Sequence, residues 1–331
     1  MRRSRAPRAT RVAALAASLI AGVVLGGCGG EDDVTAVPDC AGTHLMVQAS
    51  SRGGNGFDLF LYDLDNGGFR VIAGLNATPT DDLNPALTSD GQVIAFESAR
   101  GATGVDILLF ARCAGALAVQ PGLNSTGDDT DPAFTADAHR IAIVRDTLGD
   151  RRIRLLDGVS DLFVPLPGLH AGAGFDDWNP SPDDGAAHIA FASNRGGGNA
   201  DVFVYDRAGD SLLDLPDLIS SGEDTDPWLT PNGRWLAFAS SRAGGEGDLD
   251  LYLYDLQLRT FVALDTMVNS PAADRAPSLS DDGLKLAFQS GRADGMGGWD
   301  VWFYRRDLNQ LVPAPQLSST SNDVQPYLRW R

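Results

Sequence analysis

Acidic side chains recur at one position along the chain, three residues before a proline. The prolines stand 47 to 50 residues apart. Carboxylates that gather in one place can bind calcium or a cationic ligand, and the simplest metal candidates here are Asp128, Asp129 and Asp131. The alternative is structural: each repeated aspartate accepts hydrogen bonds from backbone amides and from a repeated arginine. We favour this alternative because every repeat has the residue. The repeated aspartates are Asp82, Asp129, Asp177, Asp224, Asp274 and Asp323.

The arginines expected to pair with these aspartates stand in Ser-x-Arg segments. The third repeat lacks the segment and reads Val144-Arg145-Asp146-Thr147, so we expect Asp129 to be without its usual arginine. The same repeat gathers Arg145, Arg151, Arg152 and Arg154, which suggests a docking patch for an acidic partner. A drifted repeat with solvated or locally paired arginines is the alternative. The repeated arginines are Arg52, Arg100, Arg195, Arg242 and Arg292.

Three tryptophans stand beside acidic or glycine-rich loops. They are Trp178, Trp228 and Trp299. Exposed tryptophans anchor protein partners or stack on sugars, whereas buried ones cover packing contacts. Both readings stay open at this point.

Patterns that carry catalysis are absent from the sequence. It contains no Gly-x-Ser-x-Gly, no His-Glu-x-x-His and no glycine-rich phosphate loop with lysine. The 4 histidines are isolated from one another. We therefore expect no catalytic residues, and no cofactor apart from the calcium alternative.

The repeats predict the elements that position these side chains. After each proline comes a short strand, a turn such as Ser89-Asp90-Gly91, and a fully apolar run such as Ile94-Ala95-Phe96. A glycine link and an alternating strand such as 202–206 follow. A period in the forties with this content predicts one four-stranded propeller blade per repeat. The fold class is all-β, a six-bladed β-propeller over residues 43–331. The C-terminal strand, from Pro326 to Trp330, is expected to complete the N-terminal blade.

These repeats resemble the WD40-like propeller repeats of the TolB family. The motifs that carry the resemblance are the Asp-x-x-Pro, Ser-x-Arg and Tyr-Asp segments of 224–255 and their counterparts. The resemblance implies a periplasmic protein-binding propeller. It does not imply the family's N-terminal α/β domain, because only about fifteen residues separate Cys28 from the first strand.

The N-terminus predicts export and a lipid anchor. Arginines and the apolar stretch 12–25 form a signal peptide over residues 1–27. Leu25-Gly26-Gly27-Cys28 matches a lipobox, so Cys28 is the expected lipid attachment site and residues 28–42 the tether. Cys40 and Cys113 remain, and they either form a disulfide or stay separate thiols.

Charge limits the partners. The chain has 44 acidic residues against 26 basic ones, with a formal net charge of −18. Nucleic acid and anionic membrane surfaces attract basic proteins, so neither is expected as a partner of this acidic chain. We expect a monomeric lipoprotein of the bacterial cell envelope, on the periplasmic or outer-surface side. Its propeller binds an envelope protein without catalysis, and the resemblance points to a peptidoglycan-associated lipoprotein. The alternative is an oligosaccharide- or peptide-binding propeller, hydrolytic or calcium-dependent, that uses the loops at its channel mouth.

Overall fold

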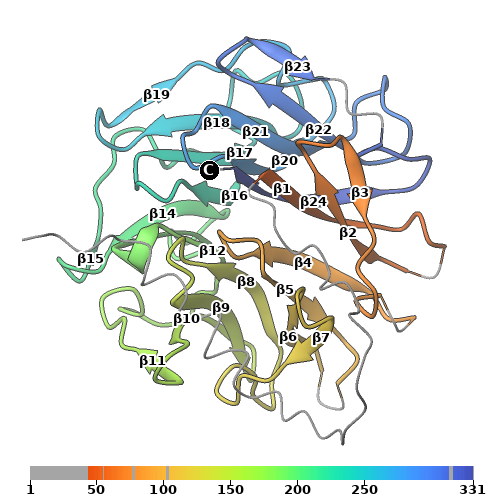
Figure 1. Ribbon diagram of the computed structural model, residues 1–331. Coiled ribbons are helices and arrows are strands. Elements are labelled where there is room, and N and C mark those ends of the chain that lie inside the picture. The colour runs from red at the N-terminus through yellow and green to blue at the C-terminus, as the bar shows by residue number, and fades with distance from the viewer. Residues whose placement is uncertain (1–43, 55, 77–78, 102–103, 313–315, 331) are drawn as a thin grey trace, which may run out of the picture.

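Six four-stranded antiparallel sheets stand around a central axis (Figure 1). The computed structural model describes residues 44–54, 56–76, 79–101, 104–312 and 316–330. Within these ranges the only other regular element is a short 3-10 turn, η2 (Asp184–Ala186). The predicted six-bladed propeller is therefore confirmed.

The first strand of each blade faces the axis, where it contacts the first strands of the neighbouring blades. All six begin with the repeated aspartate. In blade order they are β24 (Asp323–Trp330), β4 (Asp82–Leu87), β8 (Asp129–Phe134), β12 (Asp177–Pro182), β16 (Asp224–Leu229) and β20 (Asp274–Leu279).

The second strands are the apolar runs of the sequence, and most of their residues are buried because a blade packs on each face. The fully buried Phe96, Phe191, Phe238 and Phe288 lie on them. The second strands are β1 (His44–Ser50), β5 (Val93–Ser98), β9 (Arg140–Thr147), β13 (His188–Ser193), β17 (Trp235–Ser240) and β21 (Lys285–Ser290).

Third and fourth strands complete each blade toward the outside of the ring. The third strands are β2 (Asp58–Asp63), β6 (Asp106–Ala111), β10 (Asp150–Asp157), β14 (Asp201–Asp206), β18 (Asp250–Asp255) and β22 (Asp300–Arg305). The fourth strands are short: β3 (Gly68–Arg70), β7 (Ala116–Ala118), β11 (Leu162–Val164), β15 (Ser211–Leu212), β19 (Thr260–Val262) and β23 (Gln310–Val312).

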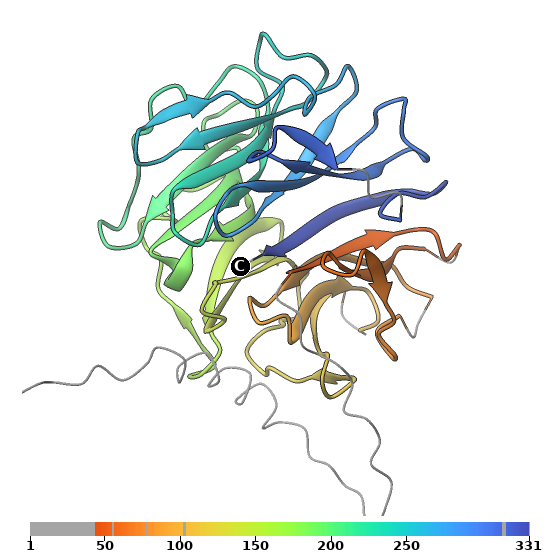
Figure 2. The ribbon, with the colours of Figure 1, turned by 45° about the horizontal axis from the view of Figure 1, so that its top comes forward.

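The ring closes by pairing the two ends of the described chain. β24 is antiparallel to β1, with His44 opposite Trp330 and Ser50 opposite Asp323. Figure 2 shows this last strand beside the first blade. The closure predicted from the sequence is confirmed, and it removes the open sheet edge that would invite aggregation.

A bulge interrupts every first strand directly before its proline. The pairing register shifts there in all six blades, for example between Leu83 and Ala86. The residue before each proline has positive φ, from 46° to 52°. Four of the six are Asn or Asp, which tolerate this conformation better than other L-residues. The six, called the bulge residues below, are Asn84, Asp131, Asn179, Asp226, Ala276 and Gln325.

In the part of the chain that the structure describes, no helix is long and apolar enough to cross a membrane.

A candidate binding cavity at the centre of the ring

A cavity of about 500 Å³ lies on the propeller axis, bounded by the first strands. All six repeat prolines line it, together with the bulge residues. We call the end at which the first strands begin the mouth, and the end at which they finish the far end. Because every blade contributes the same strand, the repeat itself builds this cavity.

Large side chains fill the far end. The rings of Trp228 and Tyr327 meet edge to face with centroids 4.6 Å apart. Arg329 is only 4% exposed, and it donates to the carbonyl oxygens of Leu87 and Phe134 on two other blades. These contacts tie β24 to β4, β8 and β16 across the axis. The cavity is therefore blind at this end.

The bulges aim backbone N–H groups toward the axis, and side chains from neighbouring blades accept them. Gln325 Oε1 accepts the N–H of Asn84 at 2.9 Å, and Asp131 Oδ2 accepts that of Asn179 at 3.1 Å. Asp226 Oδ2 accepts the N–H of Ala276 at 3.2 Å. A bulge side chain thus links one blade to the next.

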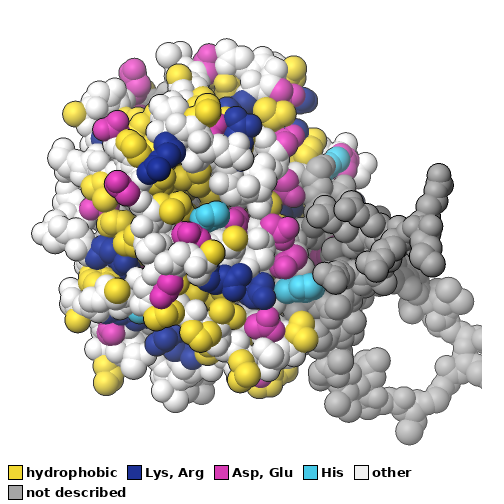
Figure 3. All heavy atoms as spheres, turned by 90° about the vertical axis from the view of Figure 1, so that its left-hand side faces the viewer, with side chains coloured by type: hydrophobic (Ala, Val, Ile, Leu, Met, Phe, Trp, Pro, Cys, Tyr) yellow, Lys and Arg dark blue, Asp and Glu magenta, His cyan; other side chains and the backbone are white. Residues whose placement is uncertain are grey.

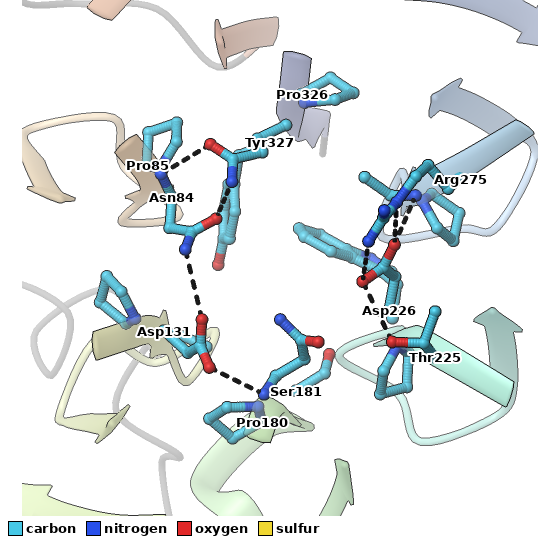
Figure 4. Close-up of a pocket in the computed structure, with 18 of the residues that line it drawn as sticks. Asn84, Pro85, Asp131, Pro180, Ser181, Thr225, Asp226, Arg275, Pro326 and Tyr327 are labelled. Carbon is cyan, nitrogen blue, oxygen red and sulfur yellow. Dashed lines mark hydrogen bonds and ion pairs between the residues drawn. The ribbon is translucent and has the colours of Figure 1, made fainter. Parts of the chain in front are cut away.

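Two carboxylates face each other across the cavity, and their surroundings differ (Figure 4). Asp226 is paired with Arg275, whose Nε lies 3.0 Å from Oδ2. Asp131 has a more distant cation, since Arg151 Nη2 lies 3.8 Å away. Behind Asp131 stands Glu97 on β5, 8% exposed, which accepts the Asp131 N–H at 2.6 Å.

The pKa values on this side of the cavity reflect the crowding of negative charge. Burial and the nearby charge of Asp131 raise the pKa of Glu97 to about 7. Burial also raises the pKa of Asp131. One proton shared by two close carboxyl groups is therefore expected near neutral pH.

The repeated aspartates do not reach the cavity as ligands, because each pairs with an arginine of its own blade. Arg292 Nη2 lies 2.9 Å from Asp274 Oδ1, and it also donates to the Val268 carbonyl in the loop between blades. We call this arrangement the clasp. It confirms the structural interpretation of the repeat. The remaining clasps are Arg52–Asp323, Arg100–Asp82, Arg195–Asp177 and Arg242–Asp224.

Blade three keeps its clasp, which corrects the expectation that Asp129 lacks an arginine. Arg145 Nε lies 2.6 Å from Asp129 Oδ1 and Nη2 donates to the Leu123 carbonyl. Arg145 occupies the strand position that serine holds in the other blades, and it reaches the same carboxylate from two residues earlier. A two-residue turn at Leu148 and Gly149, both with positive φ, then joins β9 directly to β10.

The calcium candidates lie in three separate environments. Asp128 is exposed and accepts the N–H of Val105, Asp129 is held by Arg145, and Asp131 enters the cavity. Among the residues that the structure describes, no three His, Cys, Asp or Glu side chains are grouped to hold a metal ion. The three candidates therefore do not form one site.

The arginines and tryptophans proposed for docking do not form one patch. Arg145 is in its clasp, and Arg152 lies between Asp150 at 2.7 Å and Asp177 at 3.8 Å. Arg154 is partly exposed on the same strand. Arg151, by contrast, reaches Asp131 and covers Trp178, 5.9 Å from its ring centroid.

Two of the three tryptophans line the cavity. Trp178 stands on its wall and Trp228 on its floor. Trp299 does not line it, and its backbone carbonyl accepts the N–H of Asp323. Of the residues predicted for docking, Trp178 and Trp228 thus line the cavity and Arg151 lies beside Asp131, while their role in partner binding stays a prediction.

Of the three cysteines, only Cys113 lies within the described residues. Cys113 is disulfide-bonded. Cys28 and Cys40, the predicted lipid site and the predicted disulfide partner, lie outside the described residues, as do the signal peptide and tether.

Three features of the site were not predicted from the sequence. They are the bulge residues as a set, the cation of Arg275, and the carboxyl group of Glu97. A partial signal for the bulges was present, because four of the six positions carry Asn or Asp, which tolerate positive φ, although the residue before a proline is usually extended. The sequence also contained a signal for Glu97. It stands in an otherwise apolar run where other repeats have alanine, valine or glutamine.

The outer surface shows no accumulation of one charge on the side that carries β15 and β19. Acidic, basic and apolar side chains alternate there (Figure 3). The acidic excess of the chain therefore does not form a single-sign patch on this side.

Comparisons with known proteins agree on the fold. No family model matches the sequence, and no curated protein matches it. Among solved structures, TolB from Acinetobacter baumannii superposes with a TM-score of 0.68 at 16% identity, covering 99% of this chain and 74% of that chain. A putative TolB from Agrobacterium tumefaciens gives 0.60 at 16% identity, covering 82% and 87%.

The same fold serves other functions. Kuenenia stuttgartiensis hydrazine synthase matches with a TM-score of 0.60 at 14% identity, over 86% of this chain and 46% of that one. Function therefore has to be argued from the site. The comparisons confirm the resemblance seen in the repeats at the level of the fold: the protein is a TolB-like six-bladed β-propeller.

Proposed function

We propose that this protein is a non-catalytic, protein-binding propeller of the bacterial cell envelope, whose partner docks over the mouth of the central cavity. One observation carries the proposal: the cavity is blind at its far end and lined at its mouth by polar groups that differ from blade to blade. A blind, asymmetric opening offers one specific face for a partner. The TolB-like fold supports a protein as that partner, and a peptidoglycan-associated lipoprotein is the first one to test.

The first described strand starts at the far end of the ring, because His44 pairs with Trp330. Under this proposal a lipid at Cys28 tethers the propeller to the membrane, and the propeller acts as an adaptor that offers its mouth to a partner.

Cross-linking from two matched leucines tests this proposal. Leu148, at the β9–β10 turn on the mouth side, is fully exposed; Leu258, after β18 on the far side, is 68% exposed. A photoreactive amino acid is placed at one or the other in cells of the native host. We expect one envelope protein to be joined through position 148, not through position 258, and to be lost in Cys28→Ala. Equal products from both positions would contradict a mouth-specific partner.

A small-ligand role is the second candidate, favoured by the size of the cavity. About 500 Å³ lies within the range of small-molecule pockets, and Trp178 and Trp228 offer stacking surfaces. Under this alternative, oligosaccharides or short peptides would raise the melting temperature of the purified chain, and cross-linking through position 148 would give no discrete partner.

A further inference from the structure

Cys113 lies at the junction between blade one and blade two. It stands in the turn between β6 and β7, at the far end of the ring. Arg112 fixes this turn to its own blade, because its N–H donates to the carbonyl oxygen of Gln92 at 2.8 Å. On the other side, a β-carbon at Gly74, in the loop that leaves blade one, would lie 3.5 Å from the carbonyl oxygen of Gly115. Cys113 therefore has a fixed position between two blades.

The disulfide of Cys113 joins blade two to the chain that precedes β1. Cys113 is disulfide-bonded, and the sequence contains 3 cysteines. The other two, Cys28 and Cys40, both precede β1 and lie outside the described residues. Whichever of them is the partner, the bond ties this part of the chain to the far end of blade two.

Cys40 is the better partner for two reasons. It precedes His44 by only four residues, a length of chain that spans at most about 14 Å. His44 begins β1 at the far end of the neighbouring blade, so a short link is sufficient. In addition, Cys28 is the expected lipid site, and a sulfur atom that carries a lipid as a thioether cannot also form a disulfide.

The pairing of β1 with β24, called the seam below, is the place where this bond acts. At the mouth the seam is held by the clasp of Arg52 and Asp323. At the far end both strands reach the limits of the described chain, and the ring of His44 stacks on Trp330 with centroids 4.3 Å apart. Terminal segments fray unless they are tied down, so the far end is where the seam opens first.

We propose that a disulfide between Cys40 and Cys113 latches the ring at this end, because it fixes the entrance to β1 against blade two. The bond forms by exchange with the disulfide of an oxidising envelope protein. The two thiols lose two protons and two electrons as the sulfur–sulfur bond forms, and the oxidant is reduced to two thiols. A dithiol reductant reverses the exchange. The seam is thus sensitive to the redox state of the compartment, whatever partner the propeller binds.

Fragment mapping identifies the bond. Cleavage before aspartate places Cys40 in fragment 39–57 and Cys113 in fragment 106–127, and Cys28 falls in neither. The full chain is purified from its native host with thiols blocked, digested without reductant and analysed by mass spectrometry. We expect the two fragments to be joined to each other and to separate in dithiothreitol. A link from Cys113 to the fragment with Cys28, or blocked thiols at both positions, would overturn the pairing.

Hydrogen exchange of the full chain tests the effect on the seam. Dithiothreitol is added after folding, and the amides of every blade are compared with and without it. Reduction should make the far-end halves of β1 and β24 exchange about tenfold faster, because it permits local opening. The strands β13 and β14, across the ring in blade four, should not change. Equal acceleration in all blades, or none at the seam, would overturn the latch.

Single substitutions separate the three thiols. Cys40→Ser and Cys113→Ser should each exchange at the seam as fast as the reduced wild type, with no further effect of dithiothreitol. Cys28→Ser removes a thiol but keeps the bond, so it should match the wild type and still respond to the reductant. A response that persists in Cys113→Ser, or disappears in Cys28→Ser, would contradict the assignment. Because the reductant acts on wild-type chain that has already folded, the test stands even if a variant does not fold.

Discussion

Glu97 and Asp131 show how one chemical group serves two purposes at the centre of the ring. As acceptors, both link neighbouring blades through backbone N–H groups. As acids, they are held close together in a buried place, where the charged forms repel. The hydrogen bonds favour the folded state, and the charge opposes it once both groups ionise.

Replacing Glu97 by glutamine should therefore stabilise the chain at high pH. The pKa of Glu97 is about 7 in the folded state against an ordinary value of 4.5. Between these values the folded chain holds a proton that the unfolded chain has lost, so the free energy of unfolding falls as pH rises. The loss is complete above pH 7 and is on the order of 1–3 kcal/mol.

Urea unfolding of wild type and Glu97→Gln at pH 5 and pH 8 measures this loss. The difference in the free energy of unfolding between the two proteins isolates the contribution of Glu97, whereas the pH profile of either protein alone includes all other titrating groups. We expect the variant to gain stability over the wild type at pH 8 relative to pH 5. Parallel profiles would show that the carboxyl pair is not strained in the folded chain.

At the scale of the strand, the clasp explains why serine, arginine and aspartate recur. The arginine holds the aspartate at the start of the first strand and a carbonyl in the loop that arrives from the preceding blade. It therefore fixes the junction between blades. Arg145 shows that the constraint acts on the position of the guanidinium group, because it reaches its aspartate from a different residue position.

Breaking one clasp should destabilise the whole ring. Asp274 is fully buried and Arg292 nearly so, hence Asp274→Asn leaves a buried guanidinium without its counter-charge. We expect a loss of about 3 kcal/mol, measured by chemical unfolding. Asp307→Asn breaks the exposed pair with Arg305 and serves as the control, with an unchanged midpoint expected. Equal effects of the two substitutions would contradict a structural role for the clasp.

The repeat made the fold predictable, and asymmetry made the site hard to predict. Period, proline, glycine turn and apolar run all recur, so the number of blades could be inferred from the six repeats, and ring closure from the single strand left over at Pro326 to Trp330. Asp131, Arg275 and Asp226 lie on different blades, and only closure of the ring brings them around one cavity. A sequence does not give such distances. The clasp of Arg145 was missed because the motif places the arginine two residues after the serine position, whereas Arg145 stands at the serine position itself.

For the whole molecule, stability depends on β24. This strand supplies the Asp323 clasp, the ring of Tyr327 on the floor and the Arg329 contacts to two other blades. Without it, β1 is an exposed edge and the far end of the cavity opens.

A chain cut after Asn322 should therefore lose its cooperative thermal transition and associate through the free edge of β1. Calorimetry and size-exclusion chromatography measure the two effects, with removal of Arg331 alone as the control. A monomeric truncated chain that still melts in one sharp transition would show that five blades and three strands are sufficient.

The closure of the ring also sets an order in time. Arg52 and Asp323 form one clasp although they lie 271 residues apart in sequence. The chain between them must be complete before this clasp can close. Until then the first blade has an unpaired edge, and the entropy of closing so long a loop makes the final pairing slow. The seam between β1 and β24 is thus the last part of the protein to form, and the period before it forms is when the chain is most exposed to aggregation and proteolysis.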